Sequence, residues 1–413
     1  MKNGIVLFVW IAFTTVIAFT TVACSKSNKN VSMSETEISS EETSTTLLLE
    51  SSERESETES LASETINQKE ETKTKTSTET TTSNSIEETT VPETPASTKA
   101  MINEEMMRFY HECEEAILSD LSEEFEGMTF ELKEFPKNNI VRTGIIAKNC
   151  DGNVAPTVYI DQIFKKYQRN GDMQEAITTI TDLILEGYKN MPSVEVDNIS
   201  QTNDIIPCLI NTKTNQDMLS KVPHIELHDL SIYFRGVVSV DDKGFATFII
   251  NNDIARIRGL DANDLLEIAN AYVEKNMEYK ASGIMELLFD SPPEEEEMMY
   301  VITNDKKMFG ASAMLNAPLL ESVMDEKFHT DKLMIIPSSI HECIVVDGNS
   351  SDARQIQEIV TEVNSTQVAP EEVLSASVYS YKKEEGLQVA VQKDLTEKEI
   401  SNDKEMKSPV MDM

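Results

Sequence analysis

One long segment of this chain cannot build a folded core. Residues 31–100 contain 47 Ser, Thr or Glu in 70 positions, and no aromatic residue occurs between Phe19 and Phe109. Such a segment buries too little apolar surface to offset the conformational entropy that ordering would cost. We therefore expect a disordered stalk over residues 24–100, with an r.m.s. reach of roughly 45–50 Å. The folded region is expected to begin near residue 101.

An uncharged apolar run precedes this stalk. It extends from Ile5 to Ala23 and ends directly before Cys24. Small residues before a Cys resemble a bacterial lipobox, in which the signal peptide is cut before the Cys and the Cys is lipidated. Thr21 departs from that pattern, where Leu is commoner. We predict a signal peptide over residues 1–23, with the rest lipid-anchored to the cell membrane and facing outside. The alternative is an uncleaved anchor, because 19 residues are just enough to span a bilayer.

The charge of the chain argues against a nucleic-acid partner. The formal net charge is −37, and no run of Lys or Arg is longer than two residues. Binding to a phosphate backbone needs clustered basic side chains, which this sequence lacks. The acidity is shared between the stalk and the folded region, since residues 25–100 hold 16 Glu against 7 Lys or Arg. A well-solvated folded region is therefore expected.

Residues 101–392 mix helix and strand signals. Apolar residues at helical spacing predict helices over residues 102–121, 172–188, 261–273 and 351–364. In "DLSIYFRGVV", Leu230, Ile232 and Phe234 alternate with polar residues, and "DDKG" then turns the chain into "FATFII", which predicts a hairpin. "MMYVITN", "KLMIIP" and "HECIVV" predict further strands. The order favours an α+β fold with mainly antiparallel sheet and flanking helices.

Two segments follow the same order of predicted elements. "CLINTKTNQDML" and "YVITNDKKMFGASAML" each predict a strand that ends in Asn, then a helix, and each is followed by a predicted hairpin. These strand–helix–hairpin units raise the possibility of an internal duplication, although α+β domains often reuse such a unit. We predict a single domain over residues 101–392 and a flexible polar tail over residues 393–413.

Several strings resemble a known family. "APTVYIDQIFKKYQRNG", "CLINTKTNQDMLSKVPHIELHDLSIYFRGVV", "MYVITNDKKMFGASAML", "IIPSSIHECIVV" and "EIVTEVNSTQVAPEEVLSASVYSY" resemble the domain-of-unknown-function family numbered 5688, from clostridial and related bacteria. The resemblance covers about residues 102–391 and implies one domain rather than two. It implies no activity or cofactor. His228 departs from the family pattern, which has Leu there, and the export signal departs from the cytoplasmic appearance of most members.

The segment "KLMIIPSSIHECIVVDG" contains the side-chain types of a hydrolytic triad. Ser338 or Ser339 would be the nucleophile, His341 the base and Glu342 the residue that orients it. Successive strand residues point to opposite faces, so His341 and Glu342 would diverge on a strand. Pro337 followed by two Ser is common in turns, and no Gly-x-Ser-x-Gly motif occurs. We predict the tip of a hairpin, while His341 keeps the possibility of working with a distant acid or Ser.

A second segment, "HIELHD", contains potential metal ligands. His224, Glu226 and His228 would share one strand face, but at about 3.3 Å per residue the two His would lie about 13 Å apart. Ligands of one zinc ion must lie within about 3–4 Å of each other, so a metal site that uses His224 would need a neighbouring ligand and a remote one. Pro223 disfavours a helix, and a bulge or strand start near His228 is the simpler interpretation. The acidic run Glu294–Glu297 predicts a solvated loop.

The cysteines and glycines suggest no cofactor site. Cys113, Cys150, Cys208 and Cys343 show no Cys-x-x-Cys spacing. They would form two disulfides with three possible connectivities, or remain free. Cys208 and Cys343 lie in apolar runs, which favours free thiols. No Gly-rich phosphate-binding motif is present.

These patterns together favour a membrane-tethered protein that binds a protein or a small ligand outside the cell and is not an enzyme. The alternative from a different class is a hydrolase-type enzyme that uses His341 with a Ser nucleophile.

The anchoring prediction is tested on the N-terminus. Mass spectrometry of the protein from its membrane should find Cys24 as the lipidated first residue, because the signal peptide is removed before it. A C24A variant should lose the lipid. An intact Met1 would contradict cleavage and favour the uncleaved anchor.

Overall fold

The computed structural model describes residues 45–46, 103–120, 127–148, 155–190, 201–241, 244–289 and 297–401. All of them belong to one compact unit. The predicted signal peptide, Cys24 and nearly all of the predicted stalk lie outside these residues, and so does the end of the predicted tail. The exception in the stalk is a two-residue strand, β1 (Thr45–Thr46), which pairs antiparallel with the edge of β4 (Ala155–Tyr159).

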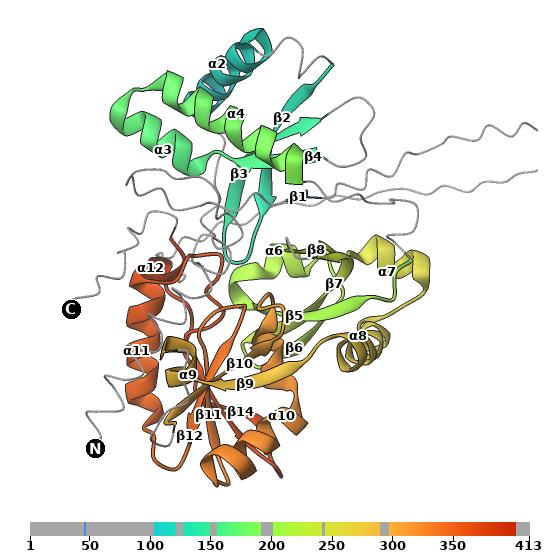
Figure 1. The fold of residues 1–413 in the computed structure, drawn as a ribbon, viewed down its shortest axis with the longest axis vertical. Coiled ribbons are helices and arrows are strands. Elements are labelled where there is room, and N and C mark those ends of the chain that lie inside the picture. Colours follow the sequence, from blue (N-terminus) through green and yellow to red (C-terminus); the bar gives the residue numbers. More distant parts are fainter. Residues whose placement is uncertain are drawn as a thin grey trace, which may run out of the picture. The chain divides into compact units, whose positions relative to one another are not determined.

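The N-terminal part is a small antiparallel sheet covered by helices on one face (Figure 1). The core between them includes Phe109, Ile145 and Ile180. Asp172 accepts a hydrogen bond from the Glu175 amide at 3.0 Å, as its place before the predicted helix requires. The elements are the strands β2 (Thr129–Pro136), β3 (Val141–Lys148) and β4, and the helices α2 (Glu104–Asp120), α3 (Asp161–Asn170) and α4 (Met173–Asn190).

A second antiparallel sheet is organised around one long strand, β7 (Leu230–Asp241). Strand β5 (Ile205–Asn211) pairs with one edge of β7. On the other edge, β6 (His224–Leu227) pairs with the first half of β7 and β8 (Gly244–Ile249) pairs with its second half. Helix α8 (Ala262–Asn276) packs on β5. Its cap, Asp261, accepts from the amides of Asn263 and Asp264. The remaining helices here are η2 (Lys213–Asn215), α6 (Gln216–Leu219) and α7 (Asn252–Arg258).

The third sheet has six antiparallel strands in the order β14-β13-β11-β12-β10-β9. Its strands are β9 (Tyr279–Gly283), β10 (Met299–Asn304), β11 (Leu333–Pro337), β12 (Cys343–Asp347), β13 (Val378–Lys382) and β14 (Gly386–Val391). The accompanying helices are α9 (Ile284–Phe289), η3 (Gly310–Leu315), α10 (Ala317–Ser322), η4 (Val323–Phe328), α11 (Ala353–Thr366) and α12 (Glu397–Ile400).

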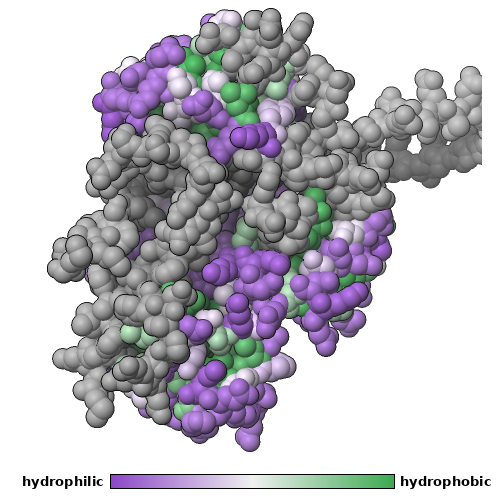
Figure 2. Space-filling view, viewed as in Figure 1, coloured by the Kyte–Doolittle hydropathy of each residue, from purple (hydrophilic) through white to green (hydrophobic). Residues whose placement is uncertain are grey.

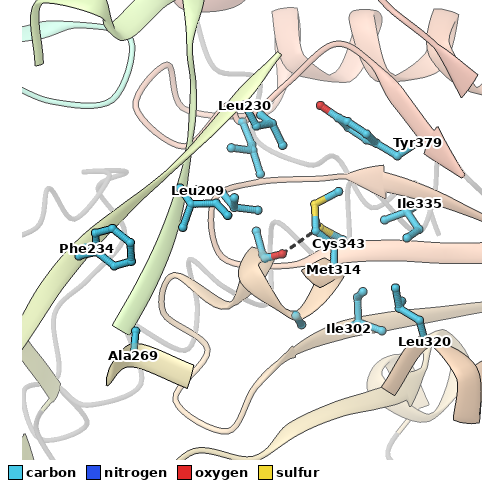
Figure 3. Close-up of a cluster of buried hydrophobic side chains, with 14 of the residues drawn as sticks. Leu209, Leu230, Phe234, Ala269, Ile302, Met314, Leu320, Ile335, Cys343 and Tyr379 are labelled. Atoms are coloured by element: carbon cyan, nitrogen blue, oxygen red, sulfur yellow. Dashed lines mark hydrogen bonds between the residues drawn. The ribbon is translucent and has the colours of Figure 1, made fainter. Parts of the chain in front are cut away.

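Burial on both faces explains the continuous apolar runs of β11 and β12. Alternate residues such as Met334 and Ile336 pack with α11, and the residues between them, such as Ile335, pack with the second sheet. Figure 3 shows the core between the second and third sheets. In it, Leu209, Leu230 and Phe234 of the second sheet belong to the same cluster as Ile335 and Tyr379 of the third. Burying each such side chain contributes about 1.5–3 kcal/mol, so this core joins the two sheets.

A buried polar network reinforces the same junction. Asp229 lies in the two-residue turn between β6 and β7. Its carboxylate accepts hydrogen bonds from Tyr379 Oη (2.6 Å), Ser375 Oγ (2.7 Å) and Ser377 Oγ (3.0 Å). The three hydroxyl residues are fully buried or nearly so. A buried hydroxyl without a hydrogen-bond partner destabilises the fold. The Asp229 carboxylate avoids this cost for three hydroxyls at once.

The predicted α+β class and antiparallel hairpins are confirmed. The two strand–helix–hairpin segments also share a strand order, first–third–second, in β5-β7-β6 and β10-β12-β11. Their duplication stays a prediction, because a shared order does not establish common origin. Within the predicted tail, α12 has a Thr396–Glu399 capping box and packs on α11.

One expectation about the acidic run is wrong for its last residue. Glu297 Oε1 accepts hydrogen bonds from the amides of Met285 (3.0 Å) and Glu286 (3.2 Å), so it satisfies the first turn of α9. The Glu297 side chain occupies the position that a Cβ at Gly283 would take. Residues 294–296 lie outside the described part.

Hydrophilic side chains cover most of the described surface in Figure 2, with small separate hydrophobic patches. Cys113, Cys208 and Cys343 are buried free thiols, and burial raises the pKa of each. Cys150 lies outside the described residues. Among the helices of the described ranges, none is both long and apolar enough to cross a membrane.

Candidate functional site

The segment that resembled a triad forms the loop of the β11–β12 hairpin. Pro337 pairs with Cys343 at its base, and residues 338–342 lie between the strands. The hairpin prediction is therefore confirmed. The expected separation of His341 and Glu342 by strand alternation does not apply, because β12 begins only at Cys343.

Glu342 is the centre of the loop. Its Oε1 accepts hydrogen bonds from Ser339 Oγ (2.8 Å) and Ser338 Oγ (3.2 Å). Its carbonyl accepts from Ser338 Oγ (2.9 Å) and from the Ser339 amide (3.3 Å). The Glu342 residue is only 2 % exposed. Burial raises its pKa to about 7, and the two hydroxyl donors lower it less than burial raises it.

His341 is held on two sides. Its Nδ1 accepts a hydrogen bond from the Phe309 amide at 3.2 Å, and its backbone amide donates to Ser339 Oγ at 2.9 Å. Nε2 lies 4.0 Å from Glu372 Oε1. The side chain is 13 % exposed. Burial lowers the pKa of His341 to about 4, so the imidazole is neutral at pH 7 with its proton on Nε2.

These contacts do not form the triad that the residue types alone would allow. In a triad, the imidazole accepts the proton of the nucleophilic hydroxyl and a carboxylate orients the imidazole. Here both serine hydroxyls donate to Glu342, and the accepting nitrogen of His341 is occupied by the Phe309 amide. The structure thus brings Ser338, Ser339 and Glu342 together but places the imidazole toward other partners.

Gly310 allows the neighbouring loop to approach closely. Thr303 Oγ1 donates to the His341 carbonyl at 2.8 Å. A Cβ at Gly310 would lie 2.5 Å from the same carbonyl oxygen and 2.8 Å from the Asn304 amide. Such distances are too short for any side chain, so a glycine is required at this position. The Ala311 amide also donates to the Ile340 carbonyl at 3.3 Å.

Four side chains from different parts of the chain make successive contacts at this loop. We call them the Arg235–Glu372 row, and they are Arg235, Phe309, His341 and Glu372. The Arg235 guanidinium carbon lies 4.8 Å from the Phe309 ring centroid, and the Phe309 and His341 ring centroids are 5.9 Å apart. All four residues are partly buried and none is fully enclosed. Arg235 Nε donates to Thr247 Oγ1 at 2.8 Å.

Sequence patterns did not indicate the segment that supports this row. The Ile340 amide donates to the Glu372 carbonyl at 2.9 Å. The β2–β3 turn contacts the same segment, since Asn138 Nδ2 donates to the carbonyls of Glu371 and Val373, both at 2.9 Å. Asn139, in a left-handed conformation with φ 63°, donates to Val373 at 2.7 Å. The two adjacent Asn residues could have predicted a turn at this position. They could not have predicted that Asn138 bonds a segment more than 200 residues away in the sequence.

The other sequence candidates lie apart from the row. His224 begins β6 and its Nδ1 donates to the Val222 carbonyl at 3.0 Å. His228 lies in the β6–β7 turn with φ 59° and donates from Nε2 to the Leu387 carbonyl at 3.1 Å. Glu226 is exposed. Within the part of the chain that the structure describes, no three His, Cys, Asp or Glu residues are grouped to hold a metal ion.

The comparisons with known proteins agree with the sequence resemblance. A family model described as "Family of unknown function (DUF5688)" matches residues 106–383. The chain belongs to this family. The match extends from α2 to the end of β13, so the DUF5688 region includes all four residues of the Arg235–Glu372 row. No curated protein and no solved structure matches the chain at a significant level.

The raised pKa of Glu342 predicts a pH dependence of stability. The folded state holds the Glu342 proton up to about pH 7, whereas the unfolded state releases it near 4.5, so stability falls as the pH rises between these values. An E342Q variant cannot ionise. We expect the free energy of unfolding of the wild type to fall by about 2–3 kcal/mol relative to E342Q from pH 4.5 to 8, as measured by urea unfolding.

His341 contributes the opposite sign, since its lowered folded-state pKa makes stability fall as the pH decreases from 6.5 toward 4. This contribution is present in both proteins and cancels from the difference. Parallel stability curves for the wild type and E342Q would contradict the buried, protonated state of Glu342.

Proposed function

We propose that the chain is a lipid-anchored binding protein that recognises a protein or a small ligand outside the cell. The apolar N-terminal run, Cys24 and the Ser/Thr/Glu-rich segment support tethering and a spacer. One contact of His341 favours binding over hydrolysis. The only ring nitrogen of His341 with a free lone pair accepts the Phe309 amide, so it is not paired with a serine hydroxyl.

The Arg235–Glu372 row is the surface that we propose for binding. Arginine and aromatic side chains contribute strongly to binding energy when they are partly desolvated. The Arg235 guanidinium lies against the Phe309 ring, and within the described residues no carboxylate forms an ion pair with it. A carboxylate or phosphate group of a ligand would complete its hydrogen bonds.

The hydrolase alternative has one contact in its favour. Glu372 Oε1 approaches His341 Nε2 to 4.0 Å, and a carboxylate in that position can orient an imidazole. It would still need the Phe309 amide to leave Nδ1 and a hydroxyl to take its place. We therefore rank hydrolysis below binding.

Binding is tested with the full-length lipoprotein and extracted surface material of its host. The wild type should retain a component that R235Q does not retain, because the substitution removes the cation and keeps the side-chain length. The matched control is R256Q, since Arg256 is an exposed arginine paired with Asp253 at 2.9 Å. Thermal unfolding of the three proteins checks that they are folded.

We expect at least a tenfold weaker retention by R235Q, which corresponds to about 1.4 kcal/mol, and none of this loss in R256Q. Equal retention by wild type and R235Q would refute the row as the binding surface. Retention of nothing by the wild type would refute the binding function for that material. Hydrolysis of a generic ester that S338A and S339A both abolish would favour the enzyme instead.

A further inference from the structure

We propose that His341 is an acid-sensitive latch on residue Phe309. In the latched state, Nδ1 accepts the Phe309 amide. A proton from solvent on Nδ1 removes this acceptor, and the imidazolium then pairs with Glu372. This proposal rests on the geometry of the loop and stands whether or not the row binds a ligand.

The latched residue has an unfavourable backbone conformation. Phe309 has φ 53° and ψ 24°, in the left-handed region that residues with a bulky side chain rarely adopt. Its amide donates to His341 Nδ1 at 3.2 Å. The preceding residue is held separately, because Asn304 Nδ2 donates to the Met308 carbonyl at 2.8 Å and Asn304 Oδ1 accepts from the Lys306 amide at 3.0 Å. The Phe309 carbonyl accepts from Ser312 Oγ at 3.1 Å, so loss of the His341 bond would release the amide side of Phe309 without releasing the whole loop.

Protonation changes the chemistry of this contact completely. A neutral imidazole has one donor and one acceptor nitrogen, whereas an imidazolium has two donors. With Nδ1 protonated, two N–H groups would face each other 3.2 Å apart, which is repulsive. One N–H bond forms at Nδ1 with a proton from a hydronium ion, which becomes water, and the hydrogen bond from the Phe309 amide is lost.

Burial and the charged groups near His341 together decide at which pH the imidazole takes up a proton. Glu372, on the segment before β13, lies 4.0 Å from Nε2 and favours the cation. Glu342, in the same loop, becomes neutral in acid and then adds no attraction. The Arg235 guanidinium of β7 lies 4.8 Å from the Phe309 ring centroid, and its like charge disfavours the cation. Burial disfavours it further and lowers the His341 pKa to about 4, so the latch is closed at neutral pH.

Opening would change the Arg235–Glu372 row. The Phe309 ring contacts both the Arg235 guanidinium and the His341 ring, so its displacement would remove the aromatic support of the guanidinium. Glu372 would pair with the imidazolium. At acidic pH, Arg235 would thus lose its contact with the Phe309 ring, and the Glu372 carboxylate would be paired with the His341 imidazolium.

The latch can be followed by NMR of the full-length protein with labelled histidine rings and phenylalanine amides. The chain has 5 His and 14 Phe, which keeps both sets of signals few. We expect the His341 ring and the Phe309 amide to titrate together with a midpoint below pH 5. In the H341N variant, the Asn oxygen replaces Nδ1 as an acceptor that does not titrate, so the Phe309 amide should not move. In E372Q, the midpoint should shift to lower pH.

Three results for His341, Phe309 and Glu372 would overturn the latch, and a fourth comes from a control amide. The first is a Phe309 amide that does not move while the His341 ring titrates. The second is the same movement in H341N as in the wild type. The third is an E372Q midpoint equal to or above that of the wild type. The NMR signal of the Ile335 amide in β11 distinguishes a local change at Phe309 from unfolding of the whole domain. Loss of this signal at the same midpoint would also count against a latch.

Discussion

The conformation of the β11–β12 loop depends on one buried carboxyl group, that of Glu342. It accepts the hydroxyls of Ser338 and Ser339, and Ser339 in turn accepts the His341 amide. This arrangement fixes the direction of the imidazole, which then accepts the amide of Phe309. The carboxyl group, whose pKa burial raises to about 7, gives the buried Ser339 hydroxyl an acceptor, whereas the Ser338 hydroxyl also reaches the Glu342 carbonyl.

The loop occupies the point where the separate layers of the fold meet. Its Ile340 amide contacts the segment before β13, and the β2–β3 turn holds the same segment through Asn138 and Asn139. Asp229 performs a similar role at the β6–β7 turn, where it accepts three buried hydroxyls. Carboxyl groups that accept buried hydroxyls therefore position both hairpins, while the apolar core supplies most of the stability.

The fold class and part of the fold were predictable from the sequence, whereas strands β2, β3 and β4 of the first sheet were not. Period-two alternation places Leu230, Ile232 and Phe234 in one core, and helical spacing places α2, α4, α8 and α11. Local turn chemistry also identified the β11–β12 hairpin. The partners of His341 were not predictable, because Phe309 and Glu372 lie about thirty residues away on either side and no periodicity relates them. His228 was unexpected as a turn residue, since a positive φ is more usual for Gly or Asn.

A double-mutant cycle between Ser339 and Glu342 tests the central claim that these side chains hold the loop together. The free energies of unfolding of the wild type, S339A, E342L and S339A/E342L are measured at pH 6 by urea unfolding. Our account predicts a coupling energy of about 1–2 kcal/mol, because each single substitution leaves a buried polar group without its partner. Additive effects within about 0.3 kcal/mol would contradict it, since the two side chains would then act independently and the loop would owe its conformation to other contacts.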